Sequence, residues 1–342
     1  MLFRSLPKHH EYLRELGCEI FVPRDVLTIG ESGGATREEA LQYAAFSSCE
    51  FNMLIQFGHC WADTKGADPR VTGKWSQGPL ALNQVKDSFA YWFSVLHGKG
   101  WNVIYWHNHD QPRIVSHYGC DSRKYHQLSA KMLAFALYLL PGTAICYQGE
   151  EIGMTNVDFR SLEEFRDVEV FTEHANMVAR GLSPAQTLAI IKARCRDNAR
   201  TPMQWSAEQY AGFSTHKPWI GVNGNYRRLN VAAQDIRPDS ILSLYRWLLN
   251  YRISEPDIRY GTVTFIHPED NSHFCFLNEG QGSSVLVLCN FRSHGAKVIL
   301  EGIELDGYSL LKGNRPRARR APKMKMSLRP YEAIVYRRER RG

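Results

Sequence analysis

Short apolar runs that each end in polar side chains constrain the fold of this chain more than any other feature. The clearest run, Trp101–Trp106, leads directly into the polar sequence His107-Asn-His-Asp-Gln-Pro-Arg113. An almost continuous apolar run is typical of a strand buried on both faces, as in a parallel sheet covered by helices. Catalytic side chains in alternating strand and helix barrels lie at the carboxyl ends of the strands. The polar residues 107–113 are therefore predicted to face a ligand.

The same pattern occurs three more times. Residues 25–31 end at Gly30-Glu31, residues 51–57 are followed by Gly58-His59, and residues 143–147 are followed by Gln148-Gly-Glu-Glu151. Amphipathic segments of helical length separate the runs, at residues 36–46, 82–97 and 123–140. This alternation predicts an α/β fold, either a (β/α) barrel or a doubly wound sheet. Four units are visible, whereas a closed barrel needs eight.

The rest of the chain has a different pattern of polar and apolar residues. Residues 156–235 are polar and rich in loop signals, with a predicted helix at 183–194, and are interpreted as an excursion before an apolar-faced helix at 238–252. After Gly261 short alternating strands follow, predicted at 262–266, 273–277, 284–289, 297–300 and 333–336. Strands of this kind separated by turns predict a small antiparallel β-sandwich over residues 261–342.

Composition excludes several classes of protein. A hydrophobic content of 44% with a mean hydropathy of −0.37 argues against disorder and against a membrane span. The eight cysteines have neither the paired spacing of a metal site nor the density of a disulfide scaffold. The N-terminus has too few apolar residues for a secretion signal. We therefore expect a cytoplasmic protein without a membrane partner.

The net charge of +7 is concentrated near the C-terminus, where residues 312–341 carry twelve Lys or Arg and two Glu. The run Arg315-Pro-Arg-Ala-Arg-Arg320 has two interpretations, a contact with nucleic acid or phosphate, or a solvated loop between strands. Because no aromatic residues for base stacking are interleaved with the arginines, the loop is favoured and no nucleic-acid partner is predicted.

Four motifs in a fixed order carry a family resemblance. They are Gly30-Glu31, Asn108–Arg113, Gln148–Asn156 and Arg196–Trp205. In this order and spacing the chain resembles the alpha-amylase superfamily of glycoside hydrolases (family 13), within the alpha-glucosidase branch that contains oligo-1,6-glucosidase, dextran glucosidase and trehalose-6-phosphate hydrolase. The resemblance runs from about His10 to the C-terminus. It implies the second half of a (β/α)8 TIM barrel, about strands 5 to 8, over residues 1–260, followed by the C-terminal β-sandwich.

The resemblance also implies roles for two carboxylates. Retaining glycosidases use one carboxylic acid as acid/base and a second carboxylate, roughly 5–5.5 Å away, as nucleophile. By resemblance Glu31 is the acid/base, and its strand-end position is expected to desolvate it partly. Asp110 resembles the third carboxylate of the family, which holds sugar hydroxyls and stabilises the oxocarbenium-like transition state.

Substrate contacts are expected, by the same resemblance, from His109, Arg113 and Arg200, with Arg196 as the rival of Arg200. A guanidinium orients two hydroxyls at once, which suits such a role. Two alternatives remain open: His109 as a packed strand-end histidine, and either Arg196 or Arg200 as one half of a salt bridge that holds the excursion.

Two other patterns are weaker. His107 and His109 would share one face of a strand, but no third metal ligand is evident nearby, so neither a metal site nor a cofactor is predicted. Glu150 and Glu151 are neighbours, and on a strand at most one of them would face the pocket.

The family's nucleophilic aspartate has no counterpart in these 342 residues, and by resemblance its strand would precede Met1, as would the calcium loop. Asp25 is predicted to lie in the same strand as Glu31, near the opposite rim. The chain is therefore interpreted as the C-terminal portion of such an enzyme, inactive by itself, with a second polypeptide as a conceivable source of the missing half-barrel.

The predicted activity of the whole enzyme is the retaining hydrolysis of alpha-glucosidic bonds at the non-reducing ends of small oligosaccharides. Specificity for 1,6, 1,4 or phosphorylated 1,1 linkages stays open. Two alternatives are a non-catalytic carbohydrate-binding or partner module derived from the same fold, and a transglucosidase or sucrose isomerase that uses the same residues.

Overall fold

The computed structural model describes residues 6–65, 68–316 and 321–339, and its first sheet is parallel. The sheet has the order β1-β2-β3-β4, with β1 at Ile29–Glu31, β2 at Met53–Ile55, β3 at Trp101–Ile104 and β4 at Thr143–Ala144. Glu31 pairs with Ile55, and Leu54 pairs with Asn102. Because all four strands run the same way, their carboxyl ends meet at one edge of the sheet.

The two faces of this sheet differ in what covers them. Alternate residues point to opposite faces, so the register places Ile29, Met53 and Val103 on one face together with Glu31. We call this the inner face. The opposite, outer face carries Gly30 and Leu54, and a Cβ on Gly30 would come within 2.9 Å of the Leu54 side chain.

Helices cover the outer face of the sheet. They are α2 (Arg37–Ala44), α3 (Leu82–Leu96), α4 (Ile114–His117), α5 (His126–Tyr138), α10 (Ile241–Ser254) and α11 (Pro256–Tyr260), and α1 (Pro7–Leu16) precedes β1. Thr36 caps α2 in a reciprocal capping box with Glu39. The largest core cluster joins Ile104 and Trp106 to the buried residues of α3, α5 and α10. No helix in the described part of the chain is long and apolar enough to cross a membrane.

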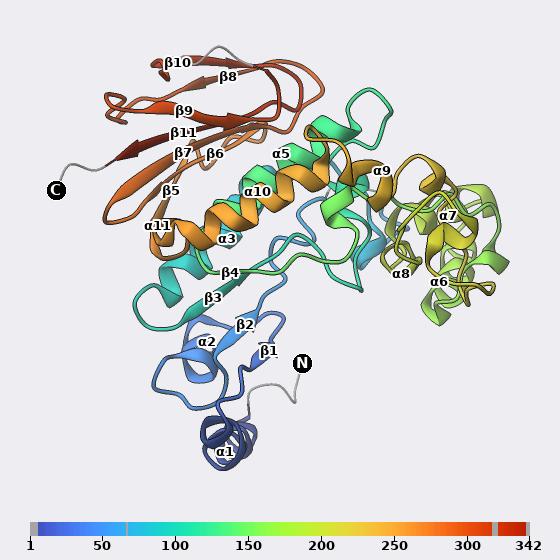
Figure 1. Cartoon of the computed structure of the whole chain (residues 1–342). Helices are drawn as coiled ribbons and strands as arrows, with labels where there is room; N and C mark the ends of the chain where they lie inside the picture. The colour runs from blue at the N-terminus through green and yellow to red at the C-terminus, as the bar shows by residue number, and fades with distance from the viewer. Residues whose placement is uncertain (1–5, 66–67, 317–320, 340–342) are drawn as a thin grey trace.

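Antiparallel sheets cover the other side of this helix layer (Figure 1). A five-stranded sheet has the order β5-β6-β7-β11-β9, and a two-stranded sheet pairs β10 with β8. The bounds are β5 Thr262–Ile266, β6 His273–Glu279, β7 Ser283–Asn290, β8 Ala296–Ile299, β9 Ser309–Gly313, β10 Lys325–Leu328 and β11 Ala333–Glu339. Residues of β6, β7 and β11 belong to the same core cluster as α5, so the helices pack between the two kinds of sheet.

Residues 156–235 form a separate lobe beside the sheet, visible in Figure 1 around α6 to α8. It contains α6 (Val168–Ala179), α7 (Pro184–Arg194), α8 (Asp197–Arg200) and α9 (Val231–Asp235). The lobe has its own apolar cluster, which includes Phe165, Met177 and Ile191. One of the contacts that join it to the rest of the chain is a buried ion pair in which Arg194 contacts Asp63, in the segment after β2, at 2.8 Å.

Most predicted elements of the α/β part are present, with shorter strands. The predicted helix at 183–194 corresponds to α7 and its N-cap Ser183. The sheet is not closed into a barrel: in the described chain β1 pairs with β2 alone and β4 with β3 alone. Apolar side chains are exposed beside this open edge, among them Leu27 and Ile29. Strands β9 and β10 were not predicted.

Two local predictions are wrong, and a third lies mostly outside the described residues. Asp25 is not in a strand but follows a short 3-10 helix, with φ at 51°. Glu150 and Glu151 are not on β4 but in the 3-10 helix Glu150–Ile152, so strand alternation does not apply to them. Of the basic run 315–320, residues 317–320 lie outside the described residues, and Arg315 donates a hydrogen bond to the Pro330 carbonyl at 3.0 Å.

The buried guanidinium of Arg252 provides a test of this packing. It donates hydrogen bonds to the carbonyls of Tyr138, Leu140 and Gly142, where α5 ends and β4 begins. Arg252→Met would leave these carbonyls without a donor, and we expect it to lower the free energy of unfolding by about 3 kcal/mol or more. Arg246→Met on the same helix removes an exposed ion pair with Asp235 and is expected to cost less than about 1 kcal/mol. Urea unfolding curves measure both, and equal losses would contradict the assignment.

Candidate active site

Asp110 lies at the centre of a cluster of charged side chains beyond the end of β3. Arg200 Nη2 contacts its Oδ1 at 2.8 Å, and Arg196 Nη1 contacts the same oxygen at 3.3 Å. His109 Nε2 lies 3.4 Å from Oδ2, and the His109 carbonyl accepts a hydrogen bond from Arg200 Nε at 3.1 Å. The Asp110 side chain is still 39% exposed. The carboxylate is therefore oriented by two guanidinium groups and remains open to a ligand.

Arg196 is itself fixed by a second carboxylate. Its Nε and Nη2 donate to the two oxygens of Asp167, at 2.5 and 2.9 Å. The hydrogen bonds with Asp167 raise the pKa of Arg196. Burial opposes ionisation of Asp167, but the hydrogen bond from Arg196 and that from the Glu169 backbone outweigh it, so the pKa of Asp167 is lowered. Arg196 thus joins the lobe to Asp110, as the salt-bridge alternative predicted.

Asp167 was missed at the level of sequence. Its only local signal is that of a helix N-cap, since its side chain accepts from the Glu169 backbone at the start of α6. Nothing in the spacing of Asp167 and Arg196 distinguishes this ion pair from many others in a polar segment.

Glu31 ends β1 on the inner face of the sheet, two strands away from β3. Strands are spaced roughly 4.8 Å apart, so the ends of β1 and β3 are separated by roughly 10 Å. Burial raises the pKa of the Tyr105 hydroxyl, with smaller contributions from Cys60 and then from the negative charge of Glu31. Glu31 is exposed, so the partial desolvation expected of it is not found in these residues.

Arg113 is almost fully buried, in contrast to Asp110. It is 1% exposed, and it donates to the carbonyls of Gln148, Asn198 and Ala199. Burial lowers its pKa to about 10, so the side chain stays charged at neutral pH. This placement argues against the predicted sugar contact of Arg113, which instead holds the loops after β3 and β4 to the lobe.

His107 and Glu150 form a buried pair behind the site. His107 Nδ1 lies 3.2 Å from Glu150 Oε2, while Tyr138 and Tyr245 donate hydrogen bonds to Glu150 Oε1. Burial lowers the pKa of His107. His109, in contrast, is 58% exposed, so it is not the packed histidine of the alternative reading. Among the residues that the structure describes, no three His, Cys, Asp or Glu side chains gather in a manner that would hold a metal ion.

Comparison with known families gives a match to the alpha-amylase catalytic domain over residues 1–261. The chain belongs to the alpha-amylase family. It is 39% identical to an oligo-1,6-glucosidase of Halalkalibacterium halodurans over 337 residues, which cover 98% of this chain and 59% of the relative. It is 36% identical to the trehalose-6-phosphate hydrolase of Escherichia coli, with coverage of 96% and 58%.

The fold of this chain is similar to solved structures over nearly its whole length. The trehalose-6-phosphate hydrolase of Bacillus licheniformis superimposes with a TM-score of 0.90 at 35% identity, covering 98% of this chain and 60% of that one. An isomaltulose synthase of Klebsiella sp. LX3 gives a TM-score of 0.88 at 30% identity, with coverage of 98% and 59%. The chain therefore spans about three fifths of the length of the relatives that it matches.

His59 shows that a polar residue after a strand need not face the site. It follows β2 but is fully buried and stacked on Phe89 at 5.1 Å. Burial lowers its pKa to about 3. Below the ordinary histidine pKa of about 6.5, His59 therefore binds a proton in the unfolded chain but not in the folded chain. Protonation stabilises the unfolded chain, so this contribution to the free energy of unfolding is lost as the pH falls from about 6.5 toward 3.

Between about pH 7.5 and pH 5 we expect the free energy of unfolding of the wild type to fall by about 2 kcal/mol more than that of His59→Gln. The reason is that the unfolded variant has no histidine at this position to take up a proton. Urea unfolding at several pH values measures it. His216→Gln, at an exposed histidine, is the control and should leave the pH profile unchanged. A constant difference between His59→Gln and the wild type would show that His59 is not held neutral.

Proposed function

We propose that this chain supplies the acid/base and the transition-state-stabilising carboxylate of a retaining alpha-glucosidase. The observation that carries the proposal is the common edge of the parallel sheet at which Glu31 ends β1 and Asp110 follows β3. Polar groups at the carboxyl ends of such strands form the active sites of barrel enzymes. Two carboxylates that are both open to solvent fit glycosidic bond cleavage, which needs proton transfer and stabilisation of a cationic sugar.

In the proposed mechanism Glu31 protonates the oxygen of the leaving group and later removes a proton from the attacking water. Asp110 holds hydroxyls of the sugar and stabilises the positive charge that develops on the ring. Arg200, anchored to Asp110 and to the His109 carbonyl, is placed to donate to the same sugar. His109 is the further hydrogen-bonding group on the exposed side of Asp110.

A nucleophile for this reaction would stand opposite Glu31, on the open side of β1. Ile29 is exposed at this edge, and we propose that strands equivalent to the remaining part of the relatives complete both the barrel and the site. They would come from a longer form of this polypeptide or from a second one. The 342 residues alone are then expected to lack turnover, because retention requires both carboxylates of the pair.

The substrates we propose are short oligosaccharides with a non-reducing terminal alpha-glucosyl residue. The relatives named above act on two different linkages by their names, oligo-1,6 and phosphorylated trehalose, at similar identity. The likeness to isomaltulose synthase favours a second candidate, sucrose isomerisation, in which the freed fructose attacks the glucosyl group in place of water. Incubation with sucrose distinguishes the two, since hydrolysis yields glucose and fructose, whereas isomerisation yields a new disaccharide.

The role of Glu31 predicts a specific chemical rescue. The chain would be combined with a polypeptide that corresponds to the first two fifths of the Halalkalibacterium halodurans relative, and hydrolysis of 4-nitrophenyl alpha-glucoside measured. We expect Glu31→Ala to lower kcat by about a thousandfold, because no base activates water in the second step. Azide needs no base, so it should restore turnover and yield a glucosyl azide.

Asp110→Ala is expected to lose activity without rescue by azide, because no proton transfer is assigned to it. Glu38→Ala, at an exposed carboxylate on α2, is the matched control and should retain full activity. Full turnover by the 342-residue chain alone, or unchanged activity of Glu31→Ala, would refute the proposal. If the wild-type mixture bound isomaltose in a titration but never cleaved the nitrophenyl glucoside, the non-catalytic binding module would be favoured instead.

A further inference from the structure

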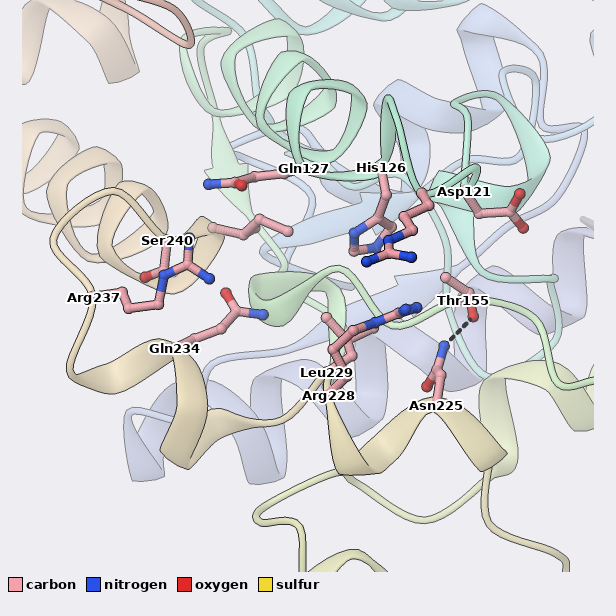
Figure 2. A pocket seen from close by; sticks show the side chains of 12 residues that line it. Asp121, His126, Gln127, Thr155, Asn225, Arg228, Leu229, Gln234, Arg237 and Ser240 are labelled. Atoms are coloured by element: carbon pink, nitrogen blue, oxygen red, sulfur yellow. Dashed lines mark hydrogen bonds between the residues drawn. The ribbon is translucent and has the colours of Figure 1, made fainter.

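A cavity of about 280 Å³ lies between the start of α5, the start of α10 and the segment before α9. None of the six predicted site residues lines it. Its lining contains three arginines, Arg123, Arg228 and Arg237, and a single carboxylate, Asp121. Figure 2 shows the side chains that surround it.

The positive charges of the cavity are poorly compensated. Within the described residues the guanidinium groups of Arg123 and Arg228 make no hydrogen bond or ion pair, and Arg237 has only a contact with Asp239 at 3.5 Å. Asp121 accepts a hydrogen bond from the Ser116 hydroxyl at 2.7 Å, and its carboxylate is directed away from the middle of the cavity (Figure 2). Cationic side chains without counterions around one cavity leave it electropositive, and such a cavity attracts anions.

Two long helices add to this field. The first residues of α5, His126 and Gln127, and the N-cap and first residue of α10, Ser240 and Ile241, line the same cavity. The N-terminus of a helix carries a partial positive charge, which favours phosphate and other anions. In α10 the N–H groups of Leu242 and Ser243 already donate to Gln234 and Ser240, so this helix contributes through its dipole. The helices are 13 and 14 residues long, so each contributes a full dipole at this point.

His126 is placed to take part. Its Nε2 donates to the Gly153 carbonyl at 2.6 Å, so Nδ1 donates to an anion only when the ring is protonated. Burial lowers the pKa of His126, the hydrogen bond to Gly153 and the charge of Asp121 oppose this, and the charge of Arg228 lowers the pKa further. Figure 2 shows the His126 ring and the Arg228 side chain among the groups that surround the cavity. An anion between them would compensate the repulsion.

We propose that this cavity binds a phosphate dianion, either inorganic phosphate or the phosphate group of a small sugar ester, at a site separate from the saccharide site. Arginine forks match the oxygens of phosphate in pairs, which suits a group with two negative charges and several acceptors. The volume lies just below the ~300–1,000 Å³ of typical small-molecule pockets, so the ligand is small. The inference does not depend on the proposed glucosidase activity, because phosphate binding is measured without turnover.

The test is isothermal titration of the 342-residue chain with inorganic phosphate and, separately, with glucose 6-phosphate. One saturable site per chain is expected for at least one probe. Arg228→Gln and Arg123→Gln should each weaken it about tenfold or more, since each loses a charge-assisted contact. Arg160→Gln, at an exposed arginine that does not line the cavity, is the charge-matched control and should bind as the wild type does.

The two probes distinguish the source of the phosphate. Tighter binding of glucose 6-phosphate assigns the site to a sugar ester, and equal or tighter binding of inorganic phosphate assigns it to the free ion. Absence of saturable binding for both probes, or affinities of Arg228→Gln and Arg123→Gln equal to that of the wild type, would overturn the proposal. Circular dichroism spectra of all variants check that their folds are unchanged.

Discussion

The packing of one helix layer between two kinds of sheet is the constraint on which the rest of this structure depends. Trp106, two residues beyond the end of β3, is 1% exposed and belongs to the same cluster as Phe274 of β6 and Val287 of β7. The C-terminal sheet thus fixes α5 and α10 from one side while the parallel strands fix them from the other. Because the loops after β3 and β4 start from this rigid layer, Asp110 and the residues around it are held in place by the core.

The inner face of the parallel sheet is covered unevenly. Its apolar cluster joins the buried Met53, Cys60, Val103 and Tyr105, with the partly buried Ile55 and Trp101 packed against it, whereas Ile29 in β1 is exposed. Unpaired strand edges and exposed apolar side chains are unfavourable in water and promote association. The edge at β1, where Leu27 and Ile29 are exposed, is therefore the least covered part of the described sheet.

Much of the fold follows from the sequence, since the four apolar runs, the long helices and five of the seven described strands after Gly261 were predicted to within a few residues, while β9 and β10 were not. The site followed less completely. The family motifs predicted Asp110, Arg196 and Arg200 as site residues, and the fold brings these three together. The same motifs also predicted Arg113, but its guanidinium donates hydrogen bonds to backbone carbonyls. His59 likewise follows a strand and is buried. Spacing along the chain reports which strand end a residue occupies, whereas the direction of its side chain depends on packing between distant segments.

The two carboxylates of the proposed site differ in how they are held. Asp110 is oriented by Arg196 and Arg200, and Arg196 is fixed in turn by the buried Asp167. Glu31 ends a three-residue strand at the open edge and has one neighbouring strand. A general acid needs a water-poor surrounding to keep its proton at neutral pH, and an exposed position at a sheet edge does not provide one. In the proposed mechanism the stabilising carboxylate is therefore preorganised within this chain, whereas Glu31 would act as acid/base only with further cover at the edge of β1.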